Sequence, residues 1–208
     1  MNGARVEAVD LSLKGPQGWV FREISVEADP GELVCLAGPS GSGRTSLLLT
    51  LAGRMRPREG SVRIDGETRP RRLHTLAALA VLPGVNDLEP RLTISEHARE
   101  RLTGQGWLHP RTKRARIEEA LAAVGLDLEP RTPTDALHPV QLTLFGVALA
   151  LLDRPRVIMV DDVGRGITAD RLAEVWEPLR ALDHTVIAAC VDPPPHAHRV
   201  VDLPLERG

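Results

Sequence analysis

Eight consecutive residues, Gly38-Pro39-Ser40-Gly41-Ser42-Gly43-Arg44-Thr45, constrain the fold of this chain more than any other stretch. The apolar run 33–37 before them predicts a buried strand, and the run 46–52 after them predicts a helix. A strand, a glycine-rich turn and a helix form the setting of a phosphate-binding loop. Glycines let successive backbone N–H groups surround an anion, and the helix N-terminus adds its positive dipole. We therefore expect a phosphate site here, with the Thr45 hydroxyl placed for magnesium.

Arg44 departs from this pattern, which has lysine at that position. The chain has only two lysines among its 26 basic residues, so a general preference for arginine would explain the change. The other interpretation is chemical, because a wide planar guanidinium and a compact ammonium are not interchangeable in a tight site. This residue alone does not decide between the two interpretations.

Composition excludes several classes of function. A chain of 208 residues is long enough to bury a core as one domain. The net charge of −2 and the aromatic content of 2% argue against a nucleic-acid partner. Cys35 and Cys190 both lie in apolar runs, which indicates buried free thiols. With no signal-like N-terminus and no apolar run near the ~20 residues that span a bilayer, we expect a cytoplasmic protein whose membrane role depends on a partner.

The order of patterns along the chain predicts one α/β domain. An antiparallel hairpin is expected from residues 5–13 and 19–28, followed further on by a short strand at 61–66 and a basic loop at 69–72. Helical spacing of apolar positions, or nearly continuous apolar character, predicts helices at 93–103, 110–124, 140–152 and 168–182. Further strands are expected at 156–162, 185–190 and 199–203. We therefore expect a core of residues 1–84 and 153–208, with a β subdomain, and a helical subdomain at 85–152.

These segments together resemble the nucleotide-binding subunit of the ATP-binding cassette (ABC) transporter family over nearly the whole length. The landmarks that match in order are Pro30-Gly31-Glu32-Leu33, the loop from Gly38 to Ser46, Leu51-Ala52-Gly53, residues 60–66, Leu92-Thr93-Ile94-Ser95-Glu96, and Leu149 to Asp161. The resemblance implies an α/β fold, namely a P-loop NTPase core of ABC type with an antiparallel β subdomain and a helical subdomain. It also implies ATP and Mg²⁺ as cofactors.

The family resemblance assigns roles to particular residues. Thr45 and Asp161 match the positions that hold magnesium, and Asp162 matches the glutamate that polarises the attacking water. The expected nucleotide-binding residues are Gly38, Pro39, Ser40, Gly41, Ser42, Gly43, Arg44, Thr45 and Ser46. Aspartate is one methylene shorter than glutamate, and a general base must come within about 2.6–3.2 Å of the proton it takes, or act through one water. Asp162 is therefore expected to be a poor base.

The resemblance also implies two partners. In the family, the helical subdomain meets a membrane-spanning transporter subunit at the cytoplasmic face of the membrane. Two nucleotide-binding domains pair head to tail, so that each ATP lies between one chain's phosphate loop and the other chain's signature motif. No nucleic acid is implied.

Several positions depart from the family pattern. Gly84 stands in place of a glutamine that touches magnesium and water, and Val191 in place of a histidine that contacts the γ-phosphate. Thr168 replaces an aspartate that links the two composite sites. The adenine-stacking aromatic falls on Gly15; Trp19, four residues on, is a candidate substitute, and packing within the hairpin is the alternative.

The signature Leu-Ser-Gly-Gly-Gln falls on Leu137-His138-Pro139-Val140-Gln141. Pro139 has no N–H and Val140 carries a branched Cβ where close approach to phosphate is needed. Pro139 suits the first turn of a helix, so this segment is expected to keep a structural role and lose its chemical one. His138 has two interpretations, a phosphate donor or a solvated loop side chain, and the second is favoured.

Each ATP site combines the phosphate-loop half of one chain with the signature half of the other, and both halves are altered in this polypeptide. A homodimer would therefore have two poor sites. A heterodimer with a competent partner would have two compromised sites. Three hypotheses follow. The favoured one is an ABC subunit that binds ATP and Mg²⁺ but hydrolyses ATP weakly or not at all. The alternatives are an active ABC ATPase that tolerates these substitutions and a scaffold that binds no nucleotide. The sequence leaves the transported substrate and the direction of transport open.

Overall fold

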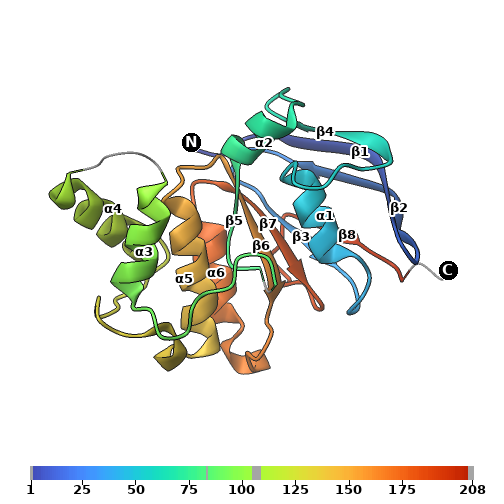
Figure 1. Ribbon diagram of the computed structural model, residues 1–208. Helices are drawn as coiled ribbons and strands as arrows, with labels where there is room; N and C mark the ends of the chain where they lie inside the picture. The colour runs from blue at the N-terminus through green and yellow to red at the C-terminus, as the bar shows by residue number, and fades with distance from the viewer. Residues whose placement is uncertain (1, 83, 105–108, 206–208) are drawn as a thin grey trace.

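The computed structural model describes residues 2–82, 84–104 and 109–205, and its described part contains a parallel sheet, an antiparallel sheet and flanking helices (Figure 1). The parallel sheet has the strand order β5-β6-β7-β3-β8. Its strands are β5 (Ala77–Leu79), β6 (Val157–Val163), β7 (Thr185–Cys190), β3 (Leu33–Ala37) and β8 (Arg199–Asp202). Every residue of β3 and β7 is buried, as expected for central strands covered on both faces.

The antiparallel sheet has the order β2-β1-β4 and confirms the predicted hairpin. It consists of β1 (Val6–Gly15), β2 (Gly18–Ala28) and β4 (Glu59–Ile64). Helix α1 (Arg44–Leu51) shares one hydrophobic core with this sheet and with one face of the parallel sheet. The phosphate loop is therefore attached at both ends to elements with buried apolar residues.

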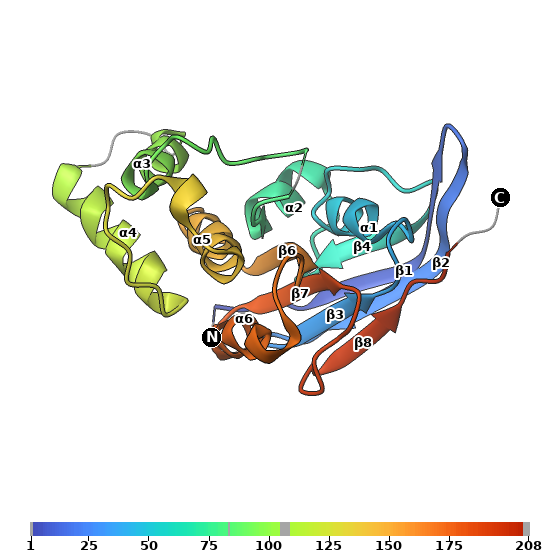
Figure 2. The same ribbon diagram turned by 90° about the horizontal axis from the view of Figure 1, so that it is seen from below.

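A helical layer covers the other face of the parallel sheet (Figure 2). Helices α5 (Pro139–Leu151) and α6 (Ala173–Ala181) lie on the sheet side of this layer, whereas α3 (Ile94–Thr103) and α4 (Pro110–Ala123) pack on α5 farther from the strands. Helix α5 is buried over most of its length and packs in one cluster with Cys35, Val160 and Ala188. A helix that is apolar on nearly all sides belongs in such a core, so the predicted buried helix is confirmed here. The boundary of a separate helical subdomain at residue 152 stays a prediction.

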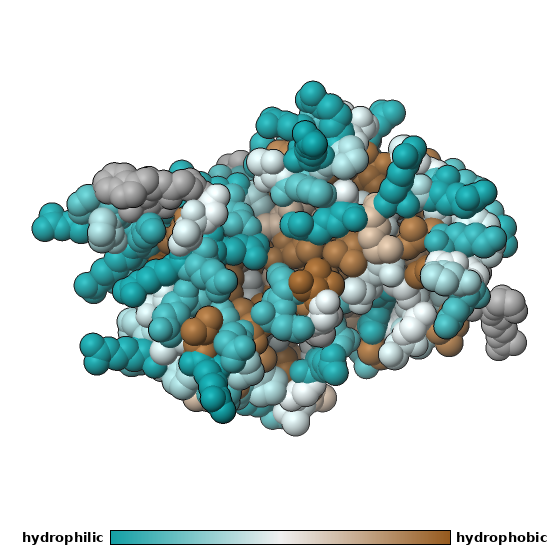
Figure 3. All heavy atoms as spheres, viewed as in Figure 1, coloured by the Kyte–Doolittle hydropathy of each residue, from teal (hydrophilic) through white to brown (hydrophobic). Residues whose placement is uncertain are grey.

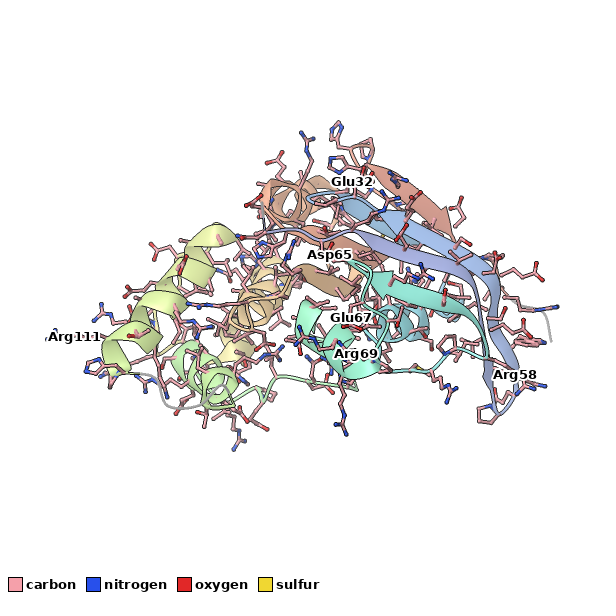
Figure 4. The ribbon with its side chains drawn as sticks, turned by 90° about the horizontal axis from the view of Figure 1, so that it is seen from above. Glu32, Arg58, Asp65, Glu67, Arg69 and Arg111 are labelled. Carbon is pink, nitrogen blue, oxygen red and sulfur yellow. The ribbon has the colours of Figure 1, made fainter. Side chains whose placement is uncertain are left out.

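Residues 70–76 differ from the expected basic loop and form helix α2 (Pro70–Leu76). Pro70 lies at the first helical turn, where its missing N–H is not needed. Glu67 accepts hydrogen bonds from the backbone N–H groups of Thr68 and Arg69 and pairs with the Arg69 guanidinium at 2.7 Å, near the start of this helix (Figure 4). The hydrogen bond from the Arg69 side chain lowers the pKa of Glu67 to about 2.

Two short 3₁₀ turns each precede a helix: η1 (Thr134–Ala136) lies before α5, and η2 (Ala169–Arg171) lies before α6.

Figure 3 shows that hydrophilic side chains cover most of one face, with hydrophobic residues reaching the surface near its middle. Within the described ranges, no helix combines the length and the apolar character needed to cross a bilayer.

Candidate phosphate-binding site

The glycine-rich loop 38–43 connects the end of β3 to the start of α1. Gly43 has φ of +86°, a region that L side chains rarely adopt. A Cβ on Gly43 would lie 2.8 Å from the carbonyl oxygen of Val20, and a Cβ on Gly38 would lie 2.5 Å from that of Leu203. Neighbouring backbone therefore excludes a side chain at both positions. Contacts with β2 and with the segment after β8 thus explain two of the three loop glycines, Gly38 and Gly43.

A pocket of about 630 Å³ opens beside this loop. Because the carboxyl ends of parallel strands meet at one edge of a sheet, the acids that end β6 lie near the loop that follows β3. The lining combines loop residues, these acids and residues from β2 and from the segments after β6 and β7: Val20, Ser40, Gly41, Gly43, Arg44, Thr45, Ser46, Asp161, Asp162, Arg165 and Val191. The structure therefore gathers most of the sequence-predicted site residues around one pocket.

Thr45 and Asp161 lie in direct contact. The Thr45 hydroxyl donates a hydrogen bond of 2.6 Å to Oδ2 of Asp161, and the backbone N–H of Asp162 donates to Oδ1 at 2.9 Å. Burial raises the pKa of Asp161, and the Thr45 hydrogen bond opposes that rise. Mg²⁺ prefers oxygen ligands and usually takes one or two carboxylates together with substrate phosphates. This hydroxyl and carboxylate are the type of donors that Mg²⁺ requires, so the residues present fit the cofactor that the family resemblance implies.

Arg44 and Asp162 form the second contact of the pocket. Arg44 is only 8% exposed, and its Nη2 lies 3.5 Å from Oδ1 of Asp162. On the other side, Nη1 of the exposed Arg165 lies 3.6 Å from Oδ2 of Asp162. Each oxygen of Asp162 therefore faces a guanidinium group. Sequence reasoning missed this arrangement, because nothing local to any one of the three residues indicates it.

Asp162 also has an uncommon backbone conformation, with φ of +49°. The pairing of β6 with β7 is irregular between Val160 and Val163, which places this residue in a bulge. Aspartate is among the non-glycine residues that tolerate the left-handed region best. Bulges redirect side chains and are frequent beside functional sites. The bulge therefore helps to set the direction of the carboxylate toward the two arginines.

Three other positions that depart from the family pattern, Gly84, Thr168 and Val191, place no polar side chain in the lining of the pocket. Gly84 is exposed with φ of +75°, and no atom lies within 4 Å of the place of a Cβ. Val191 follows β7, lines the pocket and is 53% exposed. Thr168 caps the short turn η2 and contacts Asp170, whose pKa it lowers by a hydrogen bond. Of these three residues only the apolar Val191 lines the pocket as the structure describes it.

The segment 137–141 forms the N-terminus of α5. Nδ1 of His138 accepts a hydrogen bond from the backbone N–H of Gln141 at 3.4 Å, and Oε1 of Gln141 accepts one from the backbone N–H of His138 at 3.3 Å. This is a capping box with histidine at the cap, so the prediction of a solvated loop histidine is wrong. Pro139 takes the first helical position as predicted, and Val140 is buried in the core.

Trp19 lies in the hairpin beside the phosphate loop. Nζ of Lys14 is 5.6 Å from the centre of its ring, and Cζ of Arg22 is 5.1 Å from it, within the range of cation–π contacts. Its neighbour Val20 lines the pocket, while Trp19 is absent from the lining. These contacts give Trp19 a packing role in the hairpin, and stacking on adenine stays a prediction.

Cys35 and Cys190 are buried free thiols, as predicted. They lie on the adjacent strands β3 and β7, and a hydrogen bond between the thiols raises the pKa of Cys35 and lowers that of Cys190. The backbone N–H of Gly38 donates to the carbonyl oxygen of Cys190 at 3.3 Å. This pair thus belongs to the buried support beneath the start of the phosphate loop.

The fold and this site define a P-loop nucleotide-binding domain, in which β7 separates the strand before the phosphate loop from the strand that ends in two acids. The sequence pattern of the ABC transporter family matches residues 21–164. The chain therefore belongs to the ABC transporter family and is of its ATP-binding subunit type.

Similar proteins agree with this assignment. The cytochrome c biogenesis ATP-binding export protein CcmA of Pseudomonas fluorescens is 31% identical over 183 residues, which cover 86% of this chain and 83% of that protein. The ribose import ATP-binding protein RbsA 2 of Streptomyces avermitilis is 31% identical over 170 residues, or 78% of this chain. The chain spans only about a third of the length of that ribose import protein, since the match covers 33% of it.

Solved structures support the fold. A dimeric structure of the ATP-binding cassette MJ0796, bound to ADP and Pi, has a TM-score of 0.78 at 19% identity, and 97% of each chain is covered. CbiO1 from Clostridium perfringens, part of the transporter complex cbiONQ, has a TM-score of 0.76 at 19% identity, with 90% of this chain and 78% of that chain covered.

Proposed function

We propose that this protein binds ATP–Mg²⁺ in the phosphate loop and hydrolyses ATP weakly or not at all, as the nucleotide-binding subunit of a transporter. The binding part rests on the loop 38–46, whose backbone geometry is enforced by its neighbours at Gly38 and Gly43. In this proposal the backbone N–H groups of the loop hold the phosphates, and α1 directs its positive end at them. Thr45 and Asp161 hold magnesium, which neutralises phosphate charge when it is bound.

One observation carries the proposal of weak hydrolysis. Both carboxylate oxygens of Asp162, the residue in the position of the base, face guanidinium groups at 3.5 and 3.6 Å. A general base must be directed at the proton that it accepts, and a lost base typically lowers the rate by roughly 10²–10⁴-fold. Val191 adds no polar group at the other side of the pocket. Asp162 is therefore paired with two arginines and is not directed at a water. Among the described residues that line the pocket, Asp161 is the one other acid.

The partners in this proposal are a membrane-spanning transporter subunit and a second nucleotide-binding domain, either a copy of this chain or a homologue. Support comes from the family assignment and from the dimeric form of the structural neighbour MJ0796. The protein would then lie at the cytoplasmic face of the membrane. CcmA is named as an export protein and RbsA 2 as an import protein, so similarity favours neither direction.

Calorimetric titration with ATP–Mg²⁺ and steady-state phosphate release test the proposal together. We expect binding, with turnover well below the ~1 s⁻¹ that marks the lower end of ordinary enzymes. Absence of binding would favour a scaffold that takes no nucleotide. Turnover at or above that rate, lost in Asp162→Ala, would favour an active ATPase.

A double substitution toward the family pattern, Arg44→Lys with Asp162→Glu, sharpens the test. We expect tighter ATP binding but little gain in phosphate release, because Pro139, Val140 and Val191 are unchanged. Full recovery of turnover would show that the segment 137–141 is competent, and would contradict the proposal.

A further inference from the structure

Arg44 has a partly unsatisfied guanidinium group inside the pocket. The residue is 8% exposed, and its Nη2 pairs with the carboxylate of Asp162. Within the described part of the chain, its Nη1 is buried without any hydrogen-bond partner. A buried charged group with an unpaired donor is costly, so its presence requires an explanation. The explanation that fits a pocket-lining position is an anionic ligand with more oxygen acceptors than one carboxylate oxygen.

The contact between Arg44 and Asp162 is long for a charged pair. Its 3.5 Å separation compares with 2.5 Å for the ion pair of Arg101 with Asp153, and the two aspartate side chains have similar exposures of 32% and 34%. Asp162 lies in the irregular part of β6, and its second carboxylate oxygen faces Arg165 instead of Arg44. Asp162 is therefore placed to hold Arg44 while satisfying it incompletely.

A phosphate in the loop would compete with Asp162 for the same guanidinium. Arginine binds phosphate with two parallel N–H···O bonds, which a compact lysine ammonium does not form. Arg44 begins α1 and lines the pocket together with the loop backbone. A polyphosphate that enters the loop therefore reaches Arg44, and the negative charge of Asp162 opposes its entry.

We propose that Asp162 is a built-in counter-anion for Arg44, which a polyphosphate displaces when it binds, so that Asp162 positions Arg44 and weakens polyphosphate binding in the wild type. The proposal rests on the proposed function only in that the ligand enters the phosphate loop. It gives the acid in the position of the base a different role, and the displaced carboxylate keeps its second contact, with Arg165. It also connects the two departures at positions 44 and 162, because the arginine and the aspartate form one unit.

Inorganic pyrophosphate is the probe, measured by calorimetry and by thermal unfolding of the full chain. Asp162→Asn keeps the side-chain shape and removes the charge. We expect this variant to unfold at a lower temperature without ligand, because Arg44 loses its counter-charge, and to bind pyrophosphate roughly tenfold more tightly, as expected for one nearby charge in a partly exposed pocket. Pyrophosphate should then raise its unfolding temperature more than that of the wild type.

Asp153→Asn is the matched control, because it removes an aspartate of similar exposure that pairs with an arginine away from the pocket. It should lower the unfolding temperature and leave pyrophosphate binding unchanged. If Asp162→Asn does not fold, Asp162→Gly replaces it, since glycine accepts φ of +49° without strain. The gain in pyrophosphate affinity should shrink when Arg44→Gln is added. This result separates competition for Arg44 from general repulsion between Asp162 and the phosphates.

Equal or weaker pyrophosphate binding by Asp162→Asn would overturn the proposal, as would an undiminished gain in the Arg44→Gln background. These outcomes differ from failure of the proposed function. A wild type that binds no ATP, together with tighter pyrophosphate binding by Asp162→Asn, would remove the nucleotide function and support the counter-anion. A wild type that binds ATP, together with unchanged pyrophosphate binding by Asp162→Asn, would support nucleotide binding and remove the counter-anion.

Discussion

The phosphate loop and the segment 137–141 are the two regions where the ABC family places its nucleotide contacts. This chain keeps the family residues largely in the first region and replaces most of them in the second. In the loop, the glycines remain and neighbouring backbone excludes any side chain at Gly38 and Gly43. In the segment 137–141, the local structure remains but different residues produce it. His138 and Gln141 cap α5, while Val140 is buried in the core.

The difference separates two requirements that coincide in the family pattern. A helix N-terminus needs a side-chain acceptor for its free N–H groups, and histidine meets that need here. A phosphate contact needs open backbone N–H groups, and Pro139 removes one. The segment 137–141 thus meets the first requirement, and in the function proposed here the phosphate loop alone meets the second.

The largest effect is expected from Gly43→Ala. The new Cβ would lie 2.8 Å from a carbonyl oxygen, at a backbone φ of +86°, so the loop must move. Strain of this kind costs of order 1–3 kcal/mol, and displaced amides no longer surround a phosphate. We expect ATP binding to fall below detection by calorimetry.

Gly125→Ala is the matched control for this substitution, because Gly125 also has a positive φ, of +69°, but no atom lies within 4 Å of its Cβ position. It should lower stability and leave ATP binding intact. Normal ATP binding by Gly43→Ala would mean that the loop does not form the site, and the contrast with the segment 137–141 would disappear.

Local patterns were sufficient to predict the parts of the site that one segment builds. Residues 33–37 followed by three glycines predicted the strand, the loop and the helix, because apolar burial and backbone freedom act within a few residues. The same holds for β6, whose buried residues are followed by Asp161 and Asp162 one residue before the strand ends at Val163. The basic loop predicted at 69–72 was wrong beyond Arg69, because Pro70 is suited to the first position of a helix and begins α2.

Contacts between distant segments could not be predicted in this way. Arg44 and Asp162 are 118 positions apart, and their contact depends on the strand order and on a bulge in β6. The cap made by His138 was also missed, because histidine is not among the residues preferred at a helix N-terminus. Its signal was present as Gln141 three residues later, the spacing of a capping box.

A smaller effect is expected from Asp161→Asn, which tests whether Asp161 helps to hold Mg²⁺ beside the phosphate loop. Asparagine can still accept the Thr45 hydrogen bond but is a poor ligand for a hard cation. We expect that Mg²⁺ no longer strengthens ATP binding, as measured by calorimetry with and without chelator. An unchanged response to Mg²⁺ would assign the metal to other residues.

The same variant has an expected pH dependence without ligand. Burial raises the pKa of Asp161 in the folded protein above the ordinary 3.8, so the folded state binds this proton more tightly than the unfolded state does. The charged carboxylate thus destabilises the wild type at neutral pH, and this penalty disappears as the pH falls through the raised pKa. Asp161→Asn should therefore unfold at a higher temperature than the wild type at neutral pH, with no difference below pH 3.8.

The smallest effect is expected from His138→Ala, which tests whether the segment 137–141 has only a structural role. Loss of a helix cap costs about 1 kcal/mol, which lowers the unfolding temperature of a chain of this size by roughly 2–4 °C. ATP binding by the isolated protein should not change, because His138 does not line the pocket. Thr93→Ala removes the equivalent cap of α3 and should have a similar effect on stability. Weaker ATP binding in His138→Ala alone, at unchanged stability, would mean that the histidine contacts nucleotide, and the two regions would then share one function after all.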